Sequence, residues 1–591
     1  MPYDGLFLYQ VCHELNEKLT QGRIEKIYQP AKEELVLVVN TLAGKQRLLI
    51  SANAQNARIH LTDQASSNPA SPPMFCMLLR KHLEGGRIIE LNQLGMDRVL
   101  IIRIECRNEL GEPAIKRLIC EFMGKHSNII LVAETDDNIF DGIKRYSHAV
   151  SRHREVLPGR KYLAPPTTHK ANLLTIDEDD FRATIISNKL DDPLAVALQK
   201  NLEGLSIPTC RELVKLSGLE PQLLLDYCGD YELRIVWQCI QRLLQYLHDK
   251  QLISTLTRNS QGDLLDFFAI PVAKEETNTY LTGSANHIVD TFYTEKSTME
   301  ILRRQKHFWQ GVINKETKRI NKKLTLQKKS VSDAGEANRL RLYGELITAN
   351  IYKLQKGMEE IALENYNDPL EQILVIPLDK TYTPAENAQA YYKKYNKANS
   401  TLKAAGAMAR LSEEELDYLD GVSISLEIAE TPADINEIAG ELTKQGYIRK
   451  APLTKGKKPA KETKPRIKPL EYTSPEGFTV LVGKNNRQND ALTLKTAEDH
   501  DIWLHTCKIP GSHVIIRTSG KEVPEETLLG AAALAAYYSK ARASGNVPVD
   551  YTLRKHVKKP NGAKPGYVIY EKQRTVYVNP DQEALHRTDK G

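Results

Sequence analysis

The sequence predicts a multidomain α+β protein organised around a long antiparallel coiled-coil arm. Its 591 residues are enough for about four domains. Residues 284–444 contain two long segments whose apolar residues recur mostly at spacings of three and four, as one helix face requires, and a strand-like run at residues 372–377 separates them. Short strands bounded by turn signals precede and follow this arm. We therefore expect globular domains at both ends of a helical spacer.

Residues 1–175 are expected to form one α+β domain, in which a first helix is followed by short strands and an antiparallel meander. Two turns interrupt this pattern. Gly95 opens a turn that presents Asp97 and Arg98 together, and an ordinary surface turn with a weak local ion pair is the alternative reading of these two residues. The second turn lies between two apolar strands and contains the polar residues Glu121, Lys125, His126, Ser127 and Asn128.

Residues 176–283 are expected to be mainly helical, with a tight connection at residues 203–208 between two helices. Helix-hairpin-helix modules use such a turn to bring backbone N–H groups to a phosphate. Any short helical corner has a similar sequence, so a purely structural connection is the alternative.

The two halves of the arm carry opposite charges. Residues 302–329 contain ten Lys and Arg against one acid, Glu316, whereas residues 411–441 contain ten Asp and Glu and no Lys or Arg. One reading is that these charges pair across the coiled coil and fix its register. The other is that the basic helix face is exposed and touches nucleic acid. The pairing reading sets four bases against four acids: Lys318, Arg319, Lys322 and Lys323 against Glu413, Glu414, Glu415 and Asp417.

The returning helix has a clear start signal. Thr383 can cap it, with Pro384 at its first position and Glu386 three residues after the cap. If the chain folds back at residues 366–383, the two charged segments lie antiparallel.

Residues 445–469 form a basic linker. From residue 449 onward they contain nine Lys and Arg against one acid, Glu462, together with four prolines. Such a composition favours an extended chain. A solvated tether and a tether to a polyanion are the two readings.

Residues 470–591 are expected to form a C-terminal α/β domain. Strands lead to an Ala-rich helix at residues 524–543, and a Pro/Gly-rich loop at residues 554–566 gathers basic side chains. His500, His505 and His513 could suggest a metal site, but strand alternation places neighbouring residues on opposite faces, so we expect no metal.

Composition excludes several classes of protein. The eight cysteines contain no C-x-x-C pair, which argues against a zinc site and a disulfide framework and favours reduced thiols in the cytoplasm. No window approaches a membrane span, and no signal peptide is expected. We can defend no nucleophile–base constellation, so we expect neither a catalytic residue nor a cofactor.

Seven stretches in order resemble the NFACT family and cover nearly the whole chain. They are residues 3–5, 95–98, 123–128, 344–347, 384–396, 483–486 and 501–516. The resemblance implies an N-terminal domain similar to that of formamidopyrimidine-type DNA glycosylases. Those enzymes use an N-terminal proline and a following glutamate. Here Tyr3 follows Pro2, and the cysteines cannot build the zinc finger, so the resemblance implies a nucleic-acid-binding fold without lyase chemistry.

The resemblance also implies a function in ribosome-associated quality control. The protein would bind a large ribosomal subunit obstructed by peptidyl-tRNA. It would recruit tRNA, mainly alanyl-tRNA, for template-free alanine tailing that marks the stalled chain for degradation. The ribosomal peptidyl transferase centre would make the bonds, so the protein itself would not be an enzyme. Ribosomal RNA would be a further partner, whereas neither DNA nor a membrane is expected.

The implied contacts fall in two places. Asp97 and Arg98 would contact the tRNA anticodon arm, and Glu121 with residues 125–128 would complete that surface. The C-terminal domain would lie against RNA through a second set: Lys484, Asn485, His505, Ser512, His513, Arg554, Lys555, Lys558 and Lys559. A fibronectin-binding surface adhesin and a DNA glycosylase/lyase-related DNA-binding protein are the alternative functions.

Overall fold

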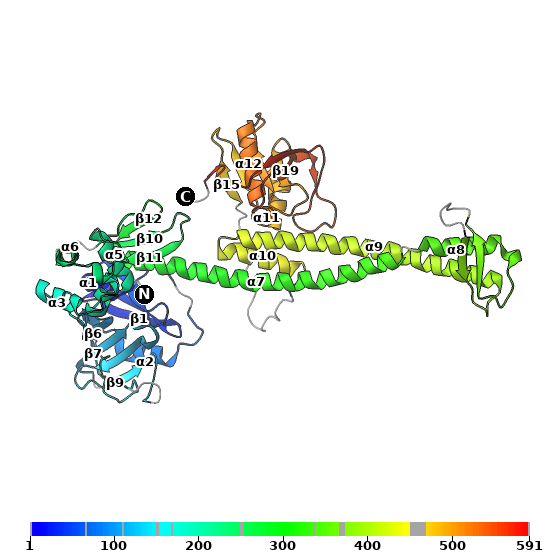
Figure 1. Ribbon diagram of the computed structural model, residues 1–591. Helices are drawn as coiled ribbons and strands as arrows, with labels where there is room; N and C mark the ends of the chain where they lie inside the picture. Colours follow the sequence, from blue (N-terminus) through cyan, green and yellow to red (C-terminus); the bar gives the residue numbers. More distant parts are fainter. Residues whose placement is uncertain are drawn as a thin grey trace. The chain divides into compact units, whose positions relative to one another are not determined.

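A computed structural model describes residues 3–65, 68–108, 111–148, 153–166, 169–248, 253–334, 337–365, 373–448 and 469–588 (Figure 1). The chain divides into two compact units, Met1–Ser297 and Thr298–Gly591. Each unit has its own buried apolar clusters, so each is described by itself. No helix among the described residues is long and apolar enough to cross a membrane.

The first unit is built on a nine-stranded antiparallel sheet with the order β4-β3-β2-β1-β5-β6-β7-β8-β9. Helix α1 (Gly5–Leu19) and helix α2 (Met74–Leu83) pack their apolar faces on it. The run β5 to β8 confirms the predicted antiparallel meander. The strands are β1 (Arg23–Ala31), β2 (Glu34–Thr41), β3 (Gly44–Ser51), β4 (Arg58–Leu61), β5 (Arg87–Gln93), β6 (Val99–Arg107), β7 (Pro113–Glu121), β8 (Asn128–Ala133) and β9 (Ile139–Gly142).

Four helices follow in the first unit: α3 (Glu178–Ile186), α4 (Leu194–Asn201), α5 (Ile207–Leu216) and α6 (Asp230–His248). The expectation of a mainly helical segment is wrong after residue 253. That part forms a three-stranded sheet of β10 (Ser254–Arg258), β11 (Leu264–Phe268) and β12 (Thr279–Gly283). Its β-branched and aromatic residues favour strands, and Leu256 and Phe267 complete the core beside α1.

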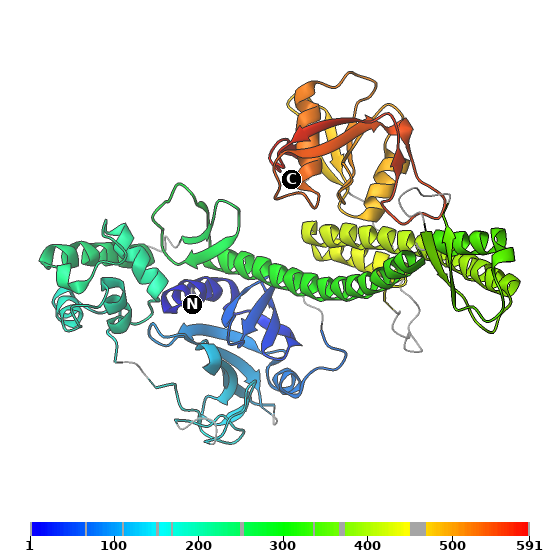
Figure 2. The same ribbon diagram turned by 45° about the vertical axis from the view of Figure 1, so that its right-hand side comes forward.

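The arm in the second unit is the predicted antiparallel helix pair. Helix α7 (Ala285–Ala334) and helix α9 (Pro384–Ile428) lie side by side in both views (Figures 1 and 2). Ile313 and Ile320 of α7 pack against Tyr418 and Leu419 of α9. Along the chain, α7 is followed by α8 (Ala337–Ala349) and by a hairpin of β13 (Glu360–Glu364) and β14 (Ile373–Pro377), which lead to α9. Helix α10 (Pro432–Lys444) follows α9.

Helix α9 begins at the predicted signal. The Thr383 hydroxyl accepts a hydrogen bond from the Glu386 backbone N–H (3.3 Å), and the Glu386 carboxylate accepts one from the Thr383 N–H (2.7 Å). Pro384 occupies the first position of the helix. This capping box satisfies two backbone donors that the first turn leaves unpaired.

The predicted charge pairs across the arm are not formed among the described residues, although the two segments lie side by side and antiparallel as expected. Among the described residues, one of the four predicted acids pairs with α7: Glu413 contacts Lys328 (2.8 Å), which is outside the predicted basic set. Arg319 instead contacts Glu316 on its own helix (2.8 Å), and Glu415 accepts a hydrogen bond from Tyr447 (3.0 Å). The seam is held by apolar contacts, because its charged side chains lie toward the rim.

The C-terminal domain has a seven-stranded sheet with the order β22-β19-β17-β18-β16-β15-β23. Helix α12 (Glu525–Tyr537) packs its alanines on one face. It ends six residues before the predicted limit, at Tyr537, because the chain turns away at Tyr538. The other elements are β15 (Leu470–Thr473), β16 (Thr479–Val482), α11 (Asn486–Ala491), β17 (Ile502–Thr506), β18 (Val514–Arg517), β19 (Val547–Leu553), β20 (Val557–Lys558), β21 (Ile569–Tyr570), β22 (Arg574–Val578) and β23 (His586–Arg587). The basic linker, residues 449–468, and Pro2 lie outside the described residues.

Candidate nucleic-acid interface

The turn between β5 and β6 is held in one conformation by backbone bonds. The Leu94 N–H donates to Val99 (3.0 Å), and the Asp97 N–H donates to Leu94 (3.1 Å). Gly95 has φ +58°, which a glycine adopts without strain. The Asp97 carboxylate accepts a hydrogen bond from the Arg98 backbone N–H (2.7 Å), which leaves the Arg98 guanidinium outside this bond. The turn therefore presents both side chains, as predicted.

Three segments that are far apart in the sequence meet behind this turn. A Cβ added to Gly5 would lie 1.8 Å from the Met96 carbonyl oxygen and 2.6 Å from the Gly204 Cα. The Leu6 N–H donates to the Gly204 carbonyl (2.9 Å), and Gly204 itself has φ +84°. Glycine is needed at both positions because the backbones approach too closely for a side chain. The start of α1, the Asp97 turn and the α4–α5 turn thus form one structure.

Asp4 fixes the start of α5 relative to the start of α1. One carboxylate oxygen accepts from the Phe7 N–H (3.0 Å) and caps α1. The other accepts from the Ser206 N–H (3.0 Å) and the Thr209 hydroxyl (2.6 Å). Burial raises the pKa of Asp4, and these bonds oppose that rise because they favour the carboxylate. The α4–α5 turn is thereby held beside the Asp97 turn.

A pocket of about 350 Å³ opens where these segments meet, and we call it the turn pocket. Its lining contains both carboxylates and cations, so it offers hydrogen-bond donors and acceptors. Its lining includes Asp97 and Arg98 from the first turn, Glu203 and Gly204 from the second, and Lys170. Such a mixed lining suits a polar planar group better than a simple anion.

The two cations of the turn pocket differ in their partners. The Lys170 ammonium donates to the Gln199 carbonyl (2.6 Å), and burial lowers the pKa of Lys170. The Arg98 guanidinium has no hydrogen-bond or ion-pair partner among the described residues. A half-buried arginine without a partner is free to form two parallel hydrogen bonds with an incoming group.

The Glu121–Asn128 turn lies at the same end of the sheet, because Val99 pairs with Glu121 and Glu121 pairs with Asn128. Glu121 itself is fully buried beneath this surface. Its carboxylate accepts hydrogen bonds from both terminal nitrogens of Arg154 and from the Tyr162 hydroxyl (2.9 Å). Burial and this carboxylate raise the pKa of Tyr162. Contact with RNA is therefore not open to Glu121, which differs from the expectation.

The other four residues of this turn divide into two pairs. Lys125 and His126 are exposed. Ser127 and Asn128 are fully buried. The Asn128 side-chain oxygen accepts a hydrogen bond from the Lys144 N–H (3.0 Å), and its side-chain nitrogen donates one to the Lys144 carbonyl (2.9 Å). The structure thus places Lys125 and His126 where a ligand can reach them, whereas Ser127 and Asn128 hold the turn in place.

In the C-terminal domain, the predicted histidines lie in an aromatic cluster on the sheet face opposite α12. Trp503 stacks on His505 (5.7 Å between ring centroids) and meets His513 edge-on (5.2 Å). Burial lowers the pKa of His505 to about 4 and that of His513 well below its usual value. Both imidazoles are therefore neutral at pH 7. His513 and Ser512 are buried, so they support the loop and cannot contact RNA directly.

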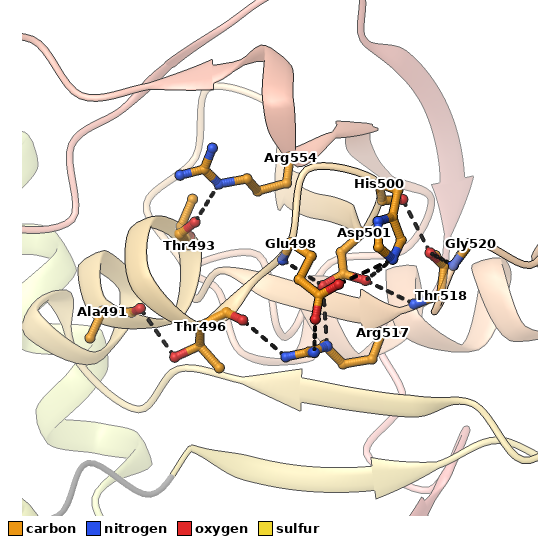
Figure 3. A network of polar contacts seen from close by, with 10 residues as sticks. All are labelled: Ala491, Thr493, Thr496, Glu498, His500, Asp501, Arg517, Thr518, Gly520 and Arg554. Atoms are coloured by element: carbon orange, nitrogen blue, oxygen red, sulfur yellow. Dashed lines mark hydrogen bonds and ion pairs between the residues drawn. The ribbon is translucent and has the colours of Figure 1, made fainter.

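A polar network beside this cluster includes Arg554 of the predicted basic loop (Figure 3). His513 shares a hydrogen bond with the Thr493 hydroxyl (2.8 Å), and the Arg554 Nε donates to the Thr493 carbonyl (2.9 Å). Beside it, fully buried Asp501 accepts from the Thr518 N–H (2.9 Å) and contacts the Arg517 Nε (3.2 Å). The network fixes the direction in which Arg554 leaves the sheet.

The remaining predicted residues of the C-terminal domain fall into two groups, one exposed and one in contact with other residues. Lys555 and Lys558 are exposed, the latter at the end of β20, whereas Lys559 pairs with Asp490. Lys484 contacts Asp434 of α10 (3.6 Å), and buried Asn485 donates to Glu437 of α10 (2.9 Å). These last two residues therefore join the C-terminal domain to the arm, which the sequence did not indicate.

Sequence reasoning missed Lys170, Glu203 and the role of Asp4 in the turn pocket. The Tyr3–Asp4–Gly5 stretch and the turn at residues 203–208 were noticed separately, but nothing in their spacing relates them. A carboxylate directly before a glycine–apolar run that starts a helix is the available signal for Asp4. No sequence signal was available for Lys170.

The fold and these sites define an RNA-binding protein of several domains. Residues 468–572 match the family described as the NFACT protein RNA binding domain, and residues 4–463 match the NFACT N-terminal and middle domains. The chain belongs to the NFACT family.

Similar proteins agree over the full length of the chain. It is 39% identical to the Rqc2 homolog RqcH of Bacillus subtilis, with 100% of both chains covered, and 34% identical to that of Streptococcus suis, with 99% of each covered. A solved structure, the N-terminal part of the fibronectin/fibrinogen-binding protein from Streptococcus suis, is 30% identical with a TM-score of 0.41 and covers 50% of this chain and 99% of its own.

Proposed function

We propose that this protein acts in ribosome quality control by binding the large ribosomal subunit obstructed by peptidyl-tRNA and bringing tRNA to it. The tRNA, mainly alanyl-tRNA, would serve template-free alanine tailing of the stalled chain, which marks that chain for degradation. Support comes from the family membership, from the RNA-binding domain family that residues 468–572 match, and from relatives named Rqc2 homologs. This role places the protein in the cytoplasm with ribosomes.

The unpartnered Arg98 beside Asp97 is the observation that carries the tRNA part of the proposal. Single-stranded RNA loops expose base edges with donors and acceptors, whereas the deep major groove of duplex RNA hides them. A planar guanidinium can grip a base edge or phosphate with two hydrogen bonds, and an adjacent carboxylate can accept from a base amino group. The mixed lining of the turn pocket fits such an edge. An anticodon loop supplies unpaired bases of this kind.

The glycosylase-like character of the first unit belongs to the same proposal. A fold of that type would supply nucleic-acid binding, and Tyr3 is buried with its hydroxyl bonded to the Ile59 carbonyl (2.7 Å) rather than placed for chemistry. The protein would position its partners, and the peptidyl transferase centre would form the peptide bonds.

Replacing Asp97 and Arg98 by Ala tests the tRNA site. The double variant should fold normally and bind large subunits nearly as well as the wild type, but it should lose copurifying tRNA and alanine tails. RNA sequencing of the purified protein and mass spectrometry of the stalled chains measure both effects. Arg87→Ala is the matched control, because Arg87 starts β5 at the opposite end of the sheet and contacts Glu105 (2.6 Å). Wild-type levels of tRNA on the double variant would refute the assignment.

A further inference from the structure

The ion pairs between the C-terminal domain and the arm all have the same direction among the described residues. In each of them the cation belongs to the C-terminal domain and the carboxylate belongs to α9 or α10. The pairs are Lys484 with Asp434 (3.6 Å), Lys540 with Asp420 (2.6 Å), Lys564 with Glu415 (3.9 Å) and Arg587 with Glu430 (2.7 Å).

The hydrogen bonds from uncharged side chains follow the same direction. Glu437 of α10 accepts from the side chains of Asn485 and Gln488 (both 2.9 Å), and buried Glu441 accepts from the side chain of Asn486 (3.2 Å). The C-terminal domain thus meets the arm with a surface of donors, and the arm supplies the acceptors. We call the part of the C-terminal domain that carries these donors the docked face.

The arm segment against the docked face has the charge of a polyanion. Residues 411–441 contain ten Asp and Glu and no Lys or Arg. Phosphate oxygens of an RNA backbone are likewise anionic acceptors, and arginine binds carboxylate and phosphate with the same paired geometry. The Arg587 guanidinium binds Glu430 in this way, with one hydrogen bond to each carboxylate oxygen (2.7 Å each). Carboxylates of the arm therefore occupy positions in which the same donors could hold phosphates.

The contact is of a kind that can open. The side chains of Lys540 and Asp420 are 60% and 37% exposed, and ion pairs at such positions are weak and screened by salt. Ile428 of α9 adds an apolar contact with the core of the domain. Domains that meet through a polar interface move relative to one another by default. A second polyanion can therefore compete with the arm for the donors of the docked face.

We infer that the acidic surface of α9 and α10 is an internal competitor for RNA, so that RNA binds the docked face only after the C-terminal domain leaves the arm. This inference rests on the proposed function and concerns its regulation, because residues 468–572 match an RNA-binding domain family. The arm and the domain belong to one chain, so the fraction of undocked molecules sets the apparent affinity for RNA. A ligand that offers many phosphates at once displaces the arm, whereas a short RNA does so poorly.

A disulfide that locks the domain on the arm tests this competition in the full-length chain. A Cβ added to Gly421 of α9 would lie 3.9 Å from the Asn486 Cγ, so Gly421→Cys with Asn486→Cys brings two thiols within reach. Asp97→Ala and Arg98→Ala are included to remove the contribution of the turn pocket. The oxidised protein should bind a poly(U) oligonucleotide roughly tenfold more weakly than the same protein after reduction. Gly421→Cys alone, oxidised in the same way, is the control and should not change.

Neutralising the acids of the arm should have the opposite effect. Asp420→Asn with Glu430→Gln and Glu437→Gln should tighten poly(U) binding roughly tenfold, because more molecules are undocked. Asp434 is kept because it belongs to the capping box of α10. The matched control removes the same charge from exposed positions of α9 that make no contact with the domain among the described residues: Glu413→Gln, Glu414→Gln and Glu427→Gln. It should bind poly(U) nearly as the wild type does.

Hydrogen exchange shows whether RNA opens the contact. Saturating poly(U) should increase the exchange of α10 in the wild-type protein and should leave it unchanged in the oxidised double-cysteine protein. Three results would overturn the inference: equal poly(U) affinity of the oxidised and reduced proteins, equal tightening in the two acid variants, or exchange of α10 that poly(U) does not raise in the wild type. The first and third together would place RNA on exposed cations such as Lys555 and Lys558 instead. Copurifying tRNA reports on the proposed tRNA role separately, so the two failures are distinguishable.

Discussion

Arg98 and Glu121 show how differently two charged residues at one sheet end are used. The Arg98 guanidinium lines the turn pocket and has no partner among the described residues. The Glu121 carboxylate, in contrast, is fully buried and pairs with Arg154. A buried ion pair contributes little net stability, yet removing one member leaves an uncompensated charge in the interior. Glu121 therefore supports the turn from below, and the Arg98 guanidinium has no partner among the described residues.

Replacing Glu121 by Ala should destabilise the first unit by about 3 to 5 kcal/mol, because Arg154 would stay buried without its carboxylate. Glu105→Ala is the control; its carboxylate is 41% exposed and contacts Arg87, so the loss should be less than about 1 kcal/mol. Both losses of stability are measured by urea unfolding, with hydrogen exchange of β7 as the readout. Equal stability of the two variants would show that the Glu121 pair is not held as described.

At the scale of single elements, packing decides which side chains a helix or strand presents. The opposite charges of α7 and α9 indicated mutual pairing, but the seam is filled mainly by apolar side chains, and Asp420 and Glu430 contact the C-terminal domain instead. His505 of β17 and His513, which directly precedes β18, similarly pack against the Trp503 ring. In both places the residue types were visible in the sequence and their direction was not.

The buried histidines predict a pH dependence for β17 and β18. Their pKa values are lowered on folding, that of His505 from 6.5 to about 4, so between these values the unfolded chain binds more protons than the folded chain. Stability is therefore complete above pH about 6.5 and falls as the pH is lowered toward 4. The loss attributable to His505 is about 3 kcal/mol at the end of this range.

Hydrogen exchange of peptides from residues 502–517, compared at pH 7 and pH 5 after correction for the intrinsic rate, measures this effect. His505→Gln should flatten the dependence, and His500→Gln should leave it intact because the His500 side chain is 44% exposed. The same dependence in all three proteins would exclude His505 as its source.

At the scale of the whole molecule, the second unit is assembled by contacts between the arm and the C-terminal domain. Several of them are partly exposed ion pairs, such as Asp420 with Lys540 and Glu430 with Arg587. Buried Glu441 adds hydrogen bonds from Tyr418 (2.8 Å) and Asn486 (3.2 Å). The Lys564 ammonium lies over the ring of Tyr418 (4.5 Å) and donates to the Tyr447 hydroxyl (2.6 Å).

A charge swap tests this docking. Asp420→Lys with Glu430→Lys should loosen the domain, because each change places like charges together, and hydrogen exchange should rise in α10 and α11. Adding Lys540→Glu and Arg587→Glu should restore protection, with a coupling of up to about 1 kcal/mol for each exposed pair. Added protection should not appear when Lys508→Glu and Lys521→Glu replace the compensating changes; both lysines are exposed and serve as controls. If the variant with all four changes exchanges as fast as the variant with only Asp420→Lys and Glu430→Lys, these pairs do not hold the domain.

The sequence by itself determined the elements whose causes are local. The capping box at Thr383, the meander from β5 to β8, the Asp97 turn opened by Gly95 and each single helix of the arm depend on residues close together in the chain. The pairing of α7 with α9 joins distant residues, such as Ile313 and Leu419, and was indicated by two matching apolar periodicities. The strands after residue 253 escaped because their apolar residues join a core made by distant segments. Only the tertiary structure brought Asp4, Met96 and Gly204 together into the turn pocket, buried Glu121 below it, and turned the arm's acids toward the C-terminal domain. Charge and spacing state which groups a segment carries, whereas burial and the pairing of distant backbones decide which of those groups remain free to bind.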